Sequence, residues 1–236
     1  MLNEKVDRPG LFIALEGIEG SGKSTQAALL AKALREKGHD VIEVKEPGGT
    51  EVGMAIREIF LSKNESLHPA TEVGLLISAK AQLIHTVIIP ALKVGKVVVC
   101  DRYTDSLYAY QWYAKGIEKK MIDRLLEASD CLLWPDLSIM VDITPEISVT
   151  RVAARKSAGG EVNVFDTKPT EFVRKTREGI QRSYAENDRG PGKAYSVIDG
   201  SGAIDQVHKN ILDAVDVYAL RLIKDYVRES RTDARQ

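Results

Sequence analysis

Residues 16–26, EGIEGSGKSTQ, hold three glycines, one lysine and three hydroxyl side chains directly after the apolar run 11–15. The phosphate-binding pattern G-x-x-x-x-G-K-[ST] is matched at Gly17, Gly22, Lys23 and Ser24. A short buried strand before the motif and the amphipathic pattern 24–38 after it supply the strand–turn–helix context that this pattern requires. The stretch is therefore predicted to bind the phosphates of a nucleoside triphosphate.

The residue types in this stretch suit separate parts of phosphate chemistry. Glycines let consecutive backbone N–H groups point at an anion, and a helix beginning near Lys23 adds the positive end of its dipole. Lys23 is expected to bridge the terminal phosphates, and Ser24 to offer a hydroxyl to Mg²⁺. The predicted phosphate-binding residues are Gly17, Ile18, Glu19, Gly20, Ser21, Gly22, Lys23, Ser24 and Thr25.

A second polar segment, DRYTDSLYAYQ at 101–111, follows another apolar run. An aspartate at the end of a strand beside the phosphate loop can order Mg²⁺ and its waters, so Asp101 is the second metal candidate. Arg102 can bind an acceptor phosphate through two parallel N–H groups and can stabilise the charge that develops in transfer. These residues point to phosphoryl transfer.

Five short apolar runs alternate with helical patterns along the chain. The runs lie at 11–15, 40–44, 96–100, 137–143 and 195–199. Such alternation predicts an α/β fold with a five-stranded parallel sheet and helices on both faces. Ligands of these sheets collect at the carboxyl ends of the strands, where Glu16, Glu46, Asp101, Asp142 and Asp199 fall.

A single domain is expected over residues 1–236, with a core at about 11–219. The polar segment 156–168, with a glycine pair between two helical patterns, is either a solvated loop or a lid over the phosphates. From residue 223 the sequence loses apolar content, and the tail 223–236 is expected to fray.

Composition excludes several classes of function. The 33 Lys and Arg nearly balance 34 Asp and Glu, so no global basic field favours nucleic acid or an anionic membrane. No stretch approaches the roughly 18 uninterrupted apolar residues of a membrane span, and a cytoplasmic location is expected. Cys100 and Cys131 lie in or beside apolar runs, as reduced core residues do, and the four histidines lack the spacing of zinc ligands.

Four motifs together resemble the thymidylate kinases, a family of P-loop nucleoside monophosphate kinases. EGIEGSGKST, EPGGT, DRYTDSLYAYQ and PDLSIMVDITPE occur in the order and spacing of that family, and the resemblance runs from about Leu11 to about Ala219. It implies a fold of the P-loop nucleoside monophosphate kinase type with a short lid. It also implies phosphorylation of dTMP to dTDP by ATP with Mg²⁺, as a step in dTTP synthesis.

The resemblance also assigns acceptor-binding residues. Glu19 matches an acid that meets the deoxyribose 3′-hydroxyl, and Arg57 matches an arginine that binds the dTMP phosphate. The complete acceptor set implied is Glu19, Glu46, Pro47, Arg57, Leu76, Lys80, Arg102, Ser106 and Gln111.

On the ATP side, Arg151 matches the residue that packs on adenine, and Asp199 and Ser201 resemble the loop beneath that ring. Bacterial relatives with a similar phosphate loop take a catalytic arginine from the lid, but 156–168 contains none. Arg155, at the entrance of this segment, is the nearest candidate, with Lys156 and Lys168 as rivals. The predicted catalytic residues are Lys23, Arg102 and Arg155.

The chain departs from the family near the base. Leu76 stands in place of a base-stacking phenylalanine, and Lys80 in place of an arginine. Leucine has no π face, and lysine cannot make a planar two-pronged contact. Two alternatives therefore stay open: a kinase for another nucleoside monophosphate, and a non-catalytic P-loop protein that binds ATP as a switch. A homodimer is also expected, because 73–92 has more apolar surface than one buried stripe needs.

Overall fold

The computed structural model describes residues 9–62, 67–160, 163–187, 189 and 193–233, the segment 220–233 by its backbone alone. Its centre is a parallel sheet of five strands in the order β2-β3-β1-β4-β5. The strands are β1 (Leu11–Glu16), β2 (Val41–Lys45), β3 (Val97–Asp101), β4 (Leu137–Asp142) and β5 (Ala194–Asp199). The expected parallel α/β sheet is confirmed, and each strand end lies within one residue of the corresponding end of its apolar run.

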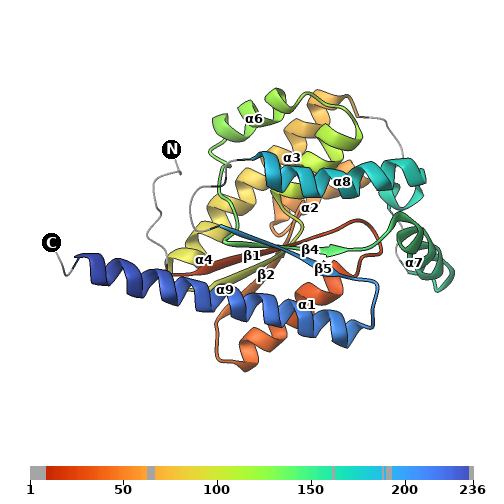
Figure 1. The fold of residues 1–236 in the computed structure, drawn as a ribbon. Helices are drawn as coiled ribbons and strands as arrows, with labels where there is room; N and C mark the ends of the chain where they lie inside the picture. The colour runs from red at the N-terminus through yellow and green to blue at the C-terminus, as the bar shows by residue number, and fades with distance from the viewer. Residues whose placement is uncertain (1–8, 63–66, 161–162, 188, 190–192, 234–236) are drawn as a thin grey trace.

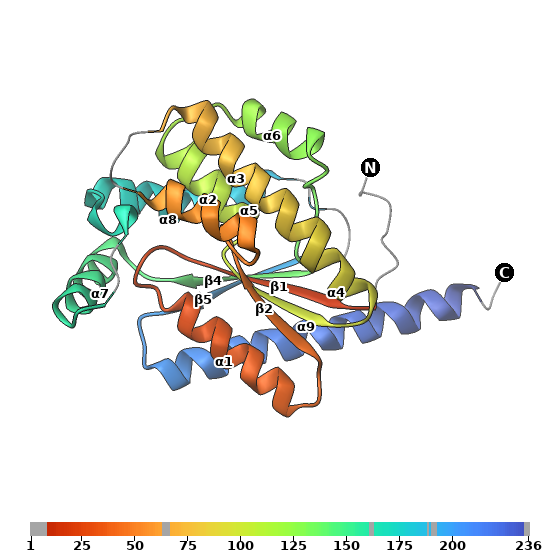
Figure 2. The ribbon, with the colours of Figure 1, turned by 180° about the vertical axis from the view of Figure 1, so that it is seen from behind.

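Helices cover both faces of this sheet (Figure 1). One face carries α1 (Lys23–Glu36) and the long α9 (Ile204–Asp233). The other face carries α2 (Glu51–Leu61), α3 (Pro69–Leu83), η1 (Ile84–Ile88), α4 (Ile89–Lys93), α5 (Thr104–Leu107), η2 (Tyr108–Ala114), α6 (Lys119–Ala128) and α8 (Thr170–Glu186) (Figure 2). The helix α9 continues to Asp233, into the tail for which the sequence suggested fraying.

Alternation along β1 explains why the sheet needs both layers. Phe12 and Ala14 belong to the hydrophobic cluster beneath α3 and its neighbours, whereas Ile13 and Leu15 belong to the cluster beneath α1 and α9. A strand that is apolar on both faces must be covered on both faces, as parallel strands generally are. This covering leaves the carboxyl end of the sheet to carry polar groups.

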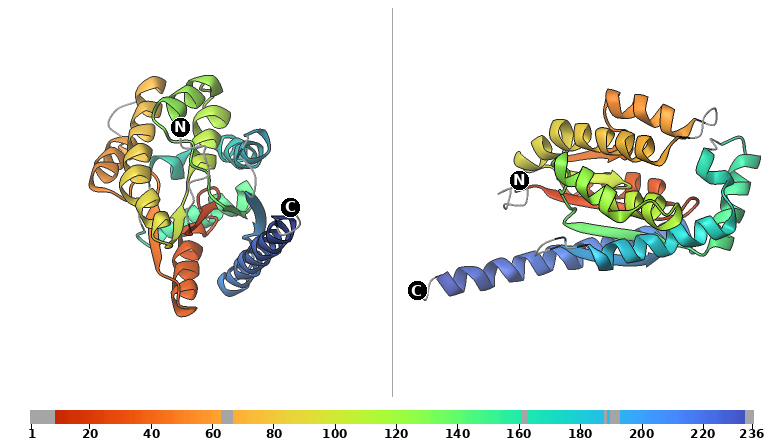
Figure 3. Two further views of the ribbon diagram at one scale, coloured as in Figure 1. Left: turned by 90° about the vertical axis from the view of Figure 1, so that its left-hand side faces the viewer. Right: turned by 90° about the horizontal axis from the view of Figure 1, so that it is seen from above.

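The lid segment lies beyond that end, between α7 (Pro145–Ser157) and α8, and contains the short 3₁₀ helix η3 (Val164–Thr167) (Figure 3). Asn163 caps η3 by accepting from Phe165 N, while Asp166 accepts from Asn163 N. This reciprocal cap gives the end of the lid a defined structure.

One continuous helical stretch, Pro69–Lys93, formed by α3, η1 and α4, is apolar and long enough to cross a membrane. Half of its most apolar window is buried inside the protein. A core helix of a soluble protein has the same composition, so this stretch is weak support for a membrane span.

Candidate active site

The loop between β1 and α1 is shaped by its glycines. Gly17, Gly20 and Gly22 have φ values of 151°, 73° and 91°, which side-chain-bearing residues rarely adopt. At Gly17 a Cβ atom would also lie 2.6 Å from Val141 O. Among the described residues no side chain caps the N-terminus of α1, so its first N–H groups are available to an anion.

Lys23, the first residue of α1, folds its side chain back over this loop. Its Nζ donates to Ile18 O at 3.4 Å. Burial, together with the nearby Arg102 guanidinium, lowers the Lys23 pKa to about 8. An anion bound in the loop would favour the charged ammonium, because it would offset both effects.

Ser24 and Asp101 meet at the adjoining strand end. Ser24 Oγ donates to Asp101 Oδ2 at 2.5 Å. The other oxygen, Asp101 Oδ1, is buried and has no hydrogen-bond partner among the described residues. A hydroxyl and a carboxylate oxygen without a donor fit Mg²⁺, which takes few protein ligands and keeps water and phosphate oxygens in its shell.

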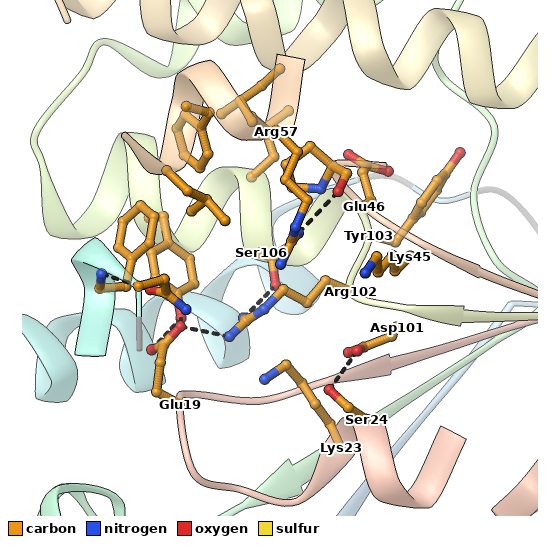
Figure 4. Close-up of a pocket in the computed structure, with 18 of the residues that line it drawn as sticks. Glu19, Lys23, Ser24, Lys45, Glu46, Arg57, Asp101, Arg102, Tyr103 and Ser106 are labelled. Atoms are coloured by element: carbon orange, nitrogen blue, oxygen red, sulfur yellow. Dashed lines mark hydrogen bonds and ion pairs between the residues drawn. The ribbon is translucent and has the colours of Figure 1, made fainter. Parts of the chain in front are cut away.

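Arg102 lies at the centre of the pocket, with a backbone φ of 68° that is uncommon for a residue with a side chain. Its Nη1 donates to Gly17 O at 2.9 Å and to Ser106 Oγ at 3.2 Å. Its Nη2 donates to Glu19 Oε1 at 2.7 Å. The side chains of Lys23 and Arg57 point toward it from the phosphate loop and from α2 (Figure 4).

Glu19 is an ionised acid inside this cationic group. Burial alone would raise its pKa, but Arg102 and Lys23, with a hydrogen bond from Tyr110, bring the pKa below its usual range. Tyr110 Oη donates to the carboxylate at 2.7 Å. The carboxylate therefore stays an acceptor at neutral pH, facing the pocket from the loop.

Glu16, the last residue of β1, is fully buried behind Arg102. It accepts from Tyr103 N at 2.8 Å and from Ser106 Oγ at 2.5 Å. Burial and the neighbouring Asp105 raise its pKa to about 7. Glu16 thus fixes the start of the helical segment that follows Arg102.

A cavity of about 910 Å³ joins the phosphate loop to α2, α3 and the lid. Most of the predicted acceptor residues line it, namely Glu19, Glu46, Pro47, Arg57, Leu76, Arg102, Ser106 and Gln111. Gly20, Lys23, Ser24, Asp101 and Arg155 line it as well. Residues from six separate stretches of sequence are brought together here.

Lys80 is the exception in the acceptor set. Its ammonium is fully buried, donates to Glu46 Oε2 at 2.7 Å and to Thr104 Oγ1 at 3.0 Å, and lies over the Tyr103 ring. It is not one of the described residues that line the cavity. Lys80 therefore supports Glu46 and the strand ends from behind the described lining of the cavity.

Arg155 reaches the cavity from the end of α7, and its guanidinium pairs with Asp166 of the lid. Lys156 and Lys168 do not line this cavity in the part of the chain that the structure describes. Phe165, beside Asp166, is buried, and the centroid of its ring lies 5.0 Å from that of Tyr110 and 5.5 Å from that of Phe60. The end of α7 thus contributes a cation, and the lid contributes an aromatic ring.

The predicted adenine residues lie on the other side of the phosphate loop. Arg151 donates to Gly20 O at 3.3 Å, to Gly200 O at 2.9 Å and to Ser201 O at 3.0 Å. Asp199 accepts from Ser201 N at 2.8 Å. These contacts connect the phosphate loop to the β5–α9 loop, and Arg151, Asp199 and Ser201 are not among the described residues that line the cavity.

Sequence reasoning missed Tyr110, Phe165 and Asp166 as members of the site. Tyr110 could have been found, because it lies four residues after Ser106 on one face of a helical segment. Phe165 is an isolated aromatic residue in a polar stretch, which alone gives no sign of its contacts. Its place in the cavity depends on how the lid folds back over α2.

Comparisons with known proteins place this chain in a family. A sequence model of the family described as Thymidylate kinase matches residues 15–211. A thymidylate kinase of Thermoanaerobacter sp. strain X514 is 38% identical over 209 residues, which covers 89% of this chain and 98% of that protein. One from Sulfurihydrogenibium sp. strain YO3AOP1 is 39% identical over 207 residues, covering 87% and 97%. The crystal structure of thymidylate kinase from Ehrlichia chaffeensis aligns with a TM-score of 0.68 at 28% identity and covers 88% of this chain and 98% of that one.

Proposed function

Because the chain belongs to the thymidylate kinase family, we propose that it uses this pocket to transfer the γ-phosphoryl group of ATP to dTMP, forming dTDP and ADP. The observation that carries the proposal is the single cavity that joins the phosphate loop to Arg57 and Arg102. A donor triphosphate on the loop and an acceptor phosphate at the two arginines would share one space. In-line transfer requires such an arrangement.

Each cationic side chain has a distinct part in this transfer. Lys23 and the N–H groups at the start of α1 bind the terminal phosphates of the donor. Arg102 is held by Gly17 and Ser106, so its position is set before the acceptor phosphate binds. Arg57, fixed by donating to Pro47 O at 3.0 Å, binds that phosphate from the α2 side.

Glu19 and Tyr110 are proposed to bind the sugar of the acceptor. The Glu19 carboxylate can accept a hydrogen bond from the 3′-hydroxyl, since Arg102 and Tyr110 keep it ionised. Loss of the hydroxyl would leave part of a buried carboxylate unpaired, at a cost on the order of 1–3 kcal/mol. The phenol of Tyr110 lies beside this contact and would limit the room around the deoxyribose.

Ser24 and Asp101 are the residues proposed to hold Mg²⁺ when ATP is bound. A bound Mg²⁺ would neutralise charge on the β- and γ-phosphates. Arg155 is proposed as the lid cation, and the aromatic surface of Phe165 as a partial replacement for the π face that Leu76 lacks. Arg151, Asp199 and Ser201 are proposed to form the adenine side.

Family membership favours a dTMP kinase over the two alternatives of another acceptor and a non-catalytic switch. We further infer a homodimer through the outer face of α3 and a cytoplasmic location. Both inferences follow from the sequence pattern.

The decisive experiment is coupled ADP production with ATP, Mg²⁺ and one monophosphate at a time: dTMP, dUMP, dCMP, dGMP and dAMP. The highest kcat/KM is expected with dTMP, and omission of Mg²⁺ with chelation by EDTA is expected to abolish turnover. A higher kcat/KM with another monophosphate would identify a different acceptor. No turnover with any of them would favour the switch.

A further inference from the structure

Glu72, on α3, is a buried carboxylate that holds two side chains of the segment 111–115. It accepts from Gln111 Nε2 at 2.9 Å, and both of its oxygens lie 2.6 Å from Lys115 Nζ. Only 7% of Glu72 and 1% of Gln111 is exposed to solvent. Gln111 lines the acceptor cavity, whereas Glu72 lies behind it.

The chemistry of this contact fixes the direction of the Gln111 amide. A carboxylate paired with an ammonium group has acceptor oxygens and no hydrogen to give. Gln111 can bind such a group only through its NH₂, since two facing acceptors would repel each other. The carbonyl oxygen of Gln111 is therefore the end of the amide left for a ligand, whichever way an amide is drawn in coordinates.

An acceptor at this place distinguishes nucleobases by their edges. Thymine and uracil have an N3–H donor, whereas cytosine has an acceptor lone pair at N3. Phe60, Leu76 and Phe165 line the same cavity as Gln111, and Lys80 is engaged elsewhere. Two acceptors placed against each other would repel, and both would lose the hydrogen bonds they make in water.

We propose that Glu72, supported by Lys115, is a positioning residue that makes the enzyme select thymine and reject cytosine by fixing the Gln111 amide. The proposal rests on the proposed dTMP kinase function and extends it to a residue outside the cavity. It also explains how base selection survives when leucine and a buried lysine occupy the family's phenylalanine and arginine positions.

The test is Glu72→Gln. Lys115 still needs an acceptor, so the amide oxygen of the new glutamine will face Lys115 and its NH₂ will face Gln111. Gln111 will then present its carbonyl oxygen to that NH₂. The NH₂ of Gln111 will therefore turn toward the base. The ratio of kcat/KM for dTMP to that for dCMP is expected to fall by about tenfold or more, the value of one good hydrogen-bond discrimination. The loss should appear mainly in the KM for dTMP, with a smaller change in kcat.

Matched variants separate positioning from general damage. Lys115→Arg keeps a cation beside Glu72 and should retain the wild-type ratio. Asp123→Asn is the second control. Asp123, on α6, accepts from Tyr108 Oη of η2 at 2.7 Å and pairs with Lys119, and none of these three residues is among those described as lining the cavity. This variant should also retain the ratio. A folded Glu72→Gln whose ratio stays within about twofold of wild type overturns the proposal.

A measurement on the wild-type protein covers the case in which Glu72→Gln does not fold. With ¹⁵N-labelled protein and bound dTMP, the Gln111 side-chain NH₂ protons should show nuclear Overhauser contacts to the Glu72 side chain. Contacts to the thymine ring in their place would overturn the proposal. If wild-type enzyme fails to phosphorylate dTMP, the proposed function itself is wrong, which is a separate result.

Discussion

At the residue scale, Arg102 shows how the site is built in advance of its ligands. Its backbone is in the left-handed region, and its guanidinium is bound by Gly17, Ser106 and Glu19. A conformation that costs on the order of 1–3 kcal/mol persists where the surroundings determine it. Here the strain directs a cation into the cavity, which in the proposed reaction would save reorganisation when the acceptor phosphate binds.

Lys23→Ala tests the phosphate loop at the same scale. Because the variant removes one fixed charge from a preformed loop, kcat is expected to fall by roughly 10²–10³-fold while the unfolding temperature stays near that of wild type. Steady-state kinetics and thermal unfolding measure the two effects. Lys32→Ala, an exposed lysine on the same helix, is the control and should behave as wild type. Near-normal turnover in folded Lys23→Ala would remove the loop lysine from the mechanism.

Glu16 gives a prediction on stability and pH. Its folded pKa of about 7 lies above its ordinary value of 4.5, so the folded state binds the extra proton between these values. The stability that Glu16 contributes is therefore complete below pH 4.5 and is lost as pH rises through 7. The free energy of unfolding of wild type minus that of Glu16→Gln should fall by about 2–3 kcal/mol between pH 5 and pH 8.

Urea unfolding at the two pH values measures this difference. Glu36→Gln, which alters an exposed carboxylate on α1, is the control and should leave the pH dependence unchanged. Parallel pH dependence in wild type and Glu16→Gln would show that Glu16 has an ordinary pKa in the folded protein.

At the element scale, two elements bring a cation and a ring to the cavity. Arg155 lies in the last turn of α7, while Phe165 and Asp166 belong to the capped turn η3 of the lid. The pair Arg155–Asp166 links these parts, so the arginine is positioned by the lid's own structure. The described residues 163–168 of the lid therefore have a capped turn, and an ion pair connects this turn to α7.

Substitutions in the lid identify the cation that acts in transfer. Arg155→Ala, Lys156→Ala and Lys168→Ala are to be assayed at saturating ATP and dTMP. A fall in kcat is expected for Arg155→Ala alone, with little change in nucleotide affinity, because only Arg155 of the three lines the cavity among the described residues. Full kcat in Arg155→Ala with loss in either lysine variant would assign the role to lysine.

A second element-scale prediction concerns how α8 packs on η2. A Cβ atom at Gly179 would lie 2.8 Å from Tyr113 Cβ and 2.9 Å from Ala109 Cα. Gly179→Val should therefore separate α8 from the segment that carries Tyr110 and Gln111, at a cost of about 1–3 kcal/mol. Urea unfolding measures the cost, with Gly202→Val, in open space, as control. An unchanged urea midpoint in Gly179→Val would show that the contact between α8 and η2 accommodates the new side chain without loss of stability.

At the scale of the whole molecule, the outer face of α3 is the proposed interface of the homodimer. Gly74 lies on this face, and a Cβ atom there would meet nothing within 4 Å. Gly74→Arg should leave the monomer folded and convert a dimer to monomer, because a second copy would meet the new side chain. Sedimentation velocity measures the change, with Ala128→Arg on exposed α6 as control. A monomeric wild-type protein, or a dimeric Gly74→Arg variant, would contradict the proposed interface.

The sequence by itself determined the parallel sheet, the phosphate loop and the neighbouring pair Asp101 and Arg102. These features depend on local spacing: apolar runs define buried strands, glycines define a loop, and residues after a strand must lie at its carboxyl end. The pattern also determined the family, since four motifs occur in order along one chain.

Only the tertiary structure decided which side chains line the cavity and which lie behind it. Lys80 pairs with Glu46 behind the cavity, Glu72 meets Gln111 across two helices, and Phe165 reaches the cavity from the lid. The partners in the first two pairs are 34 and 39 residues apart in sequence. Buried polar side chains must find partners wherever the packed elements supply them, and no local pattern states which those will be.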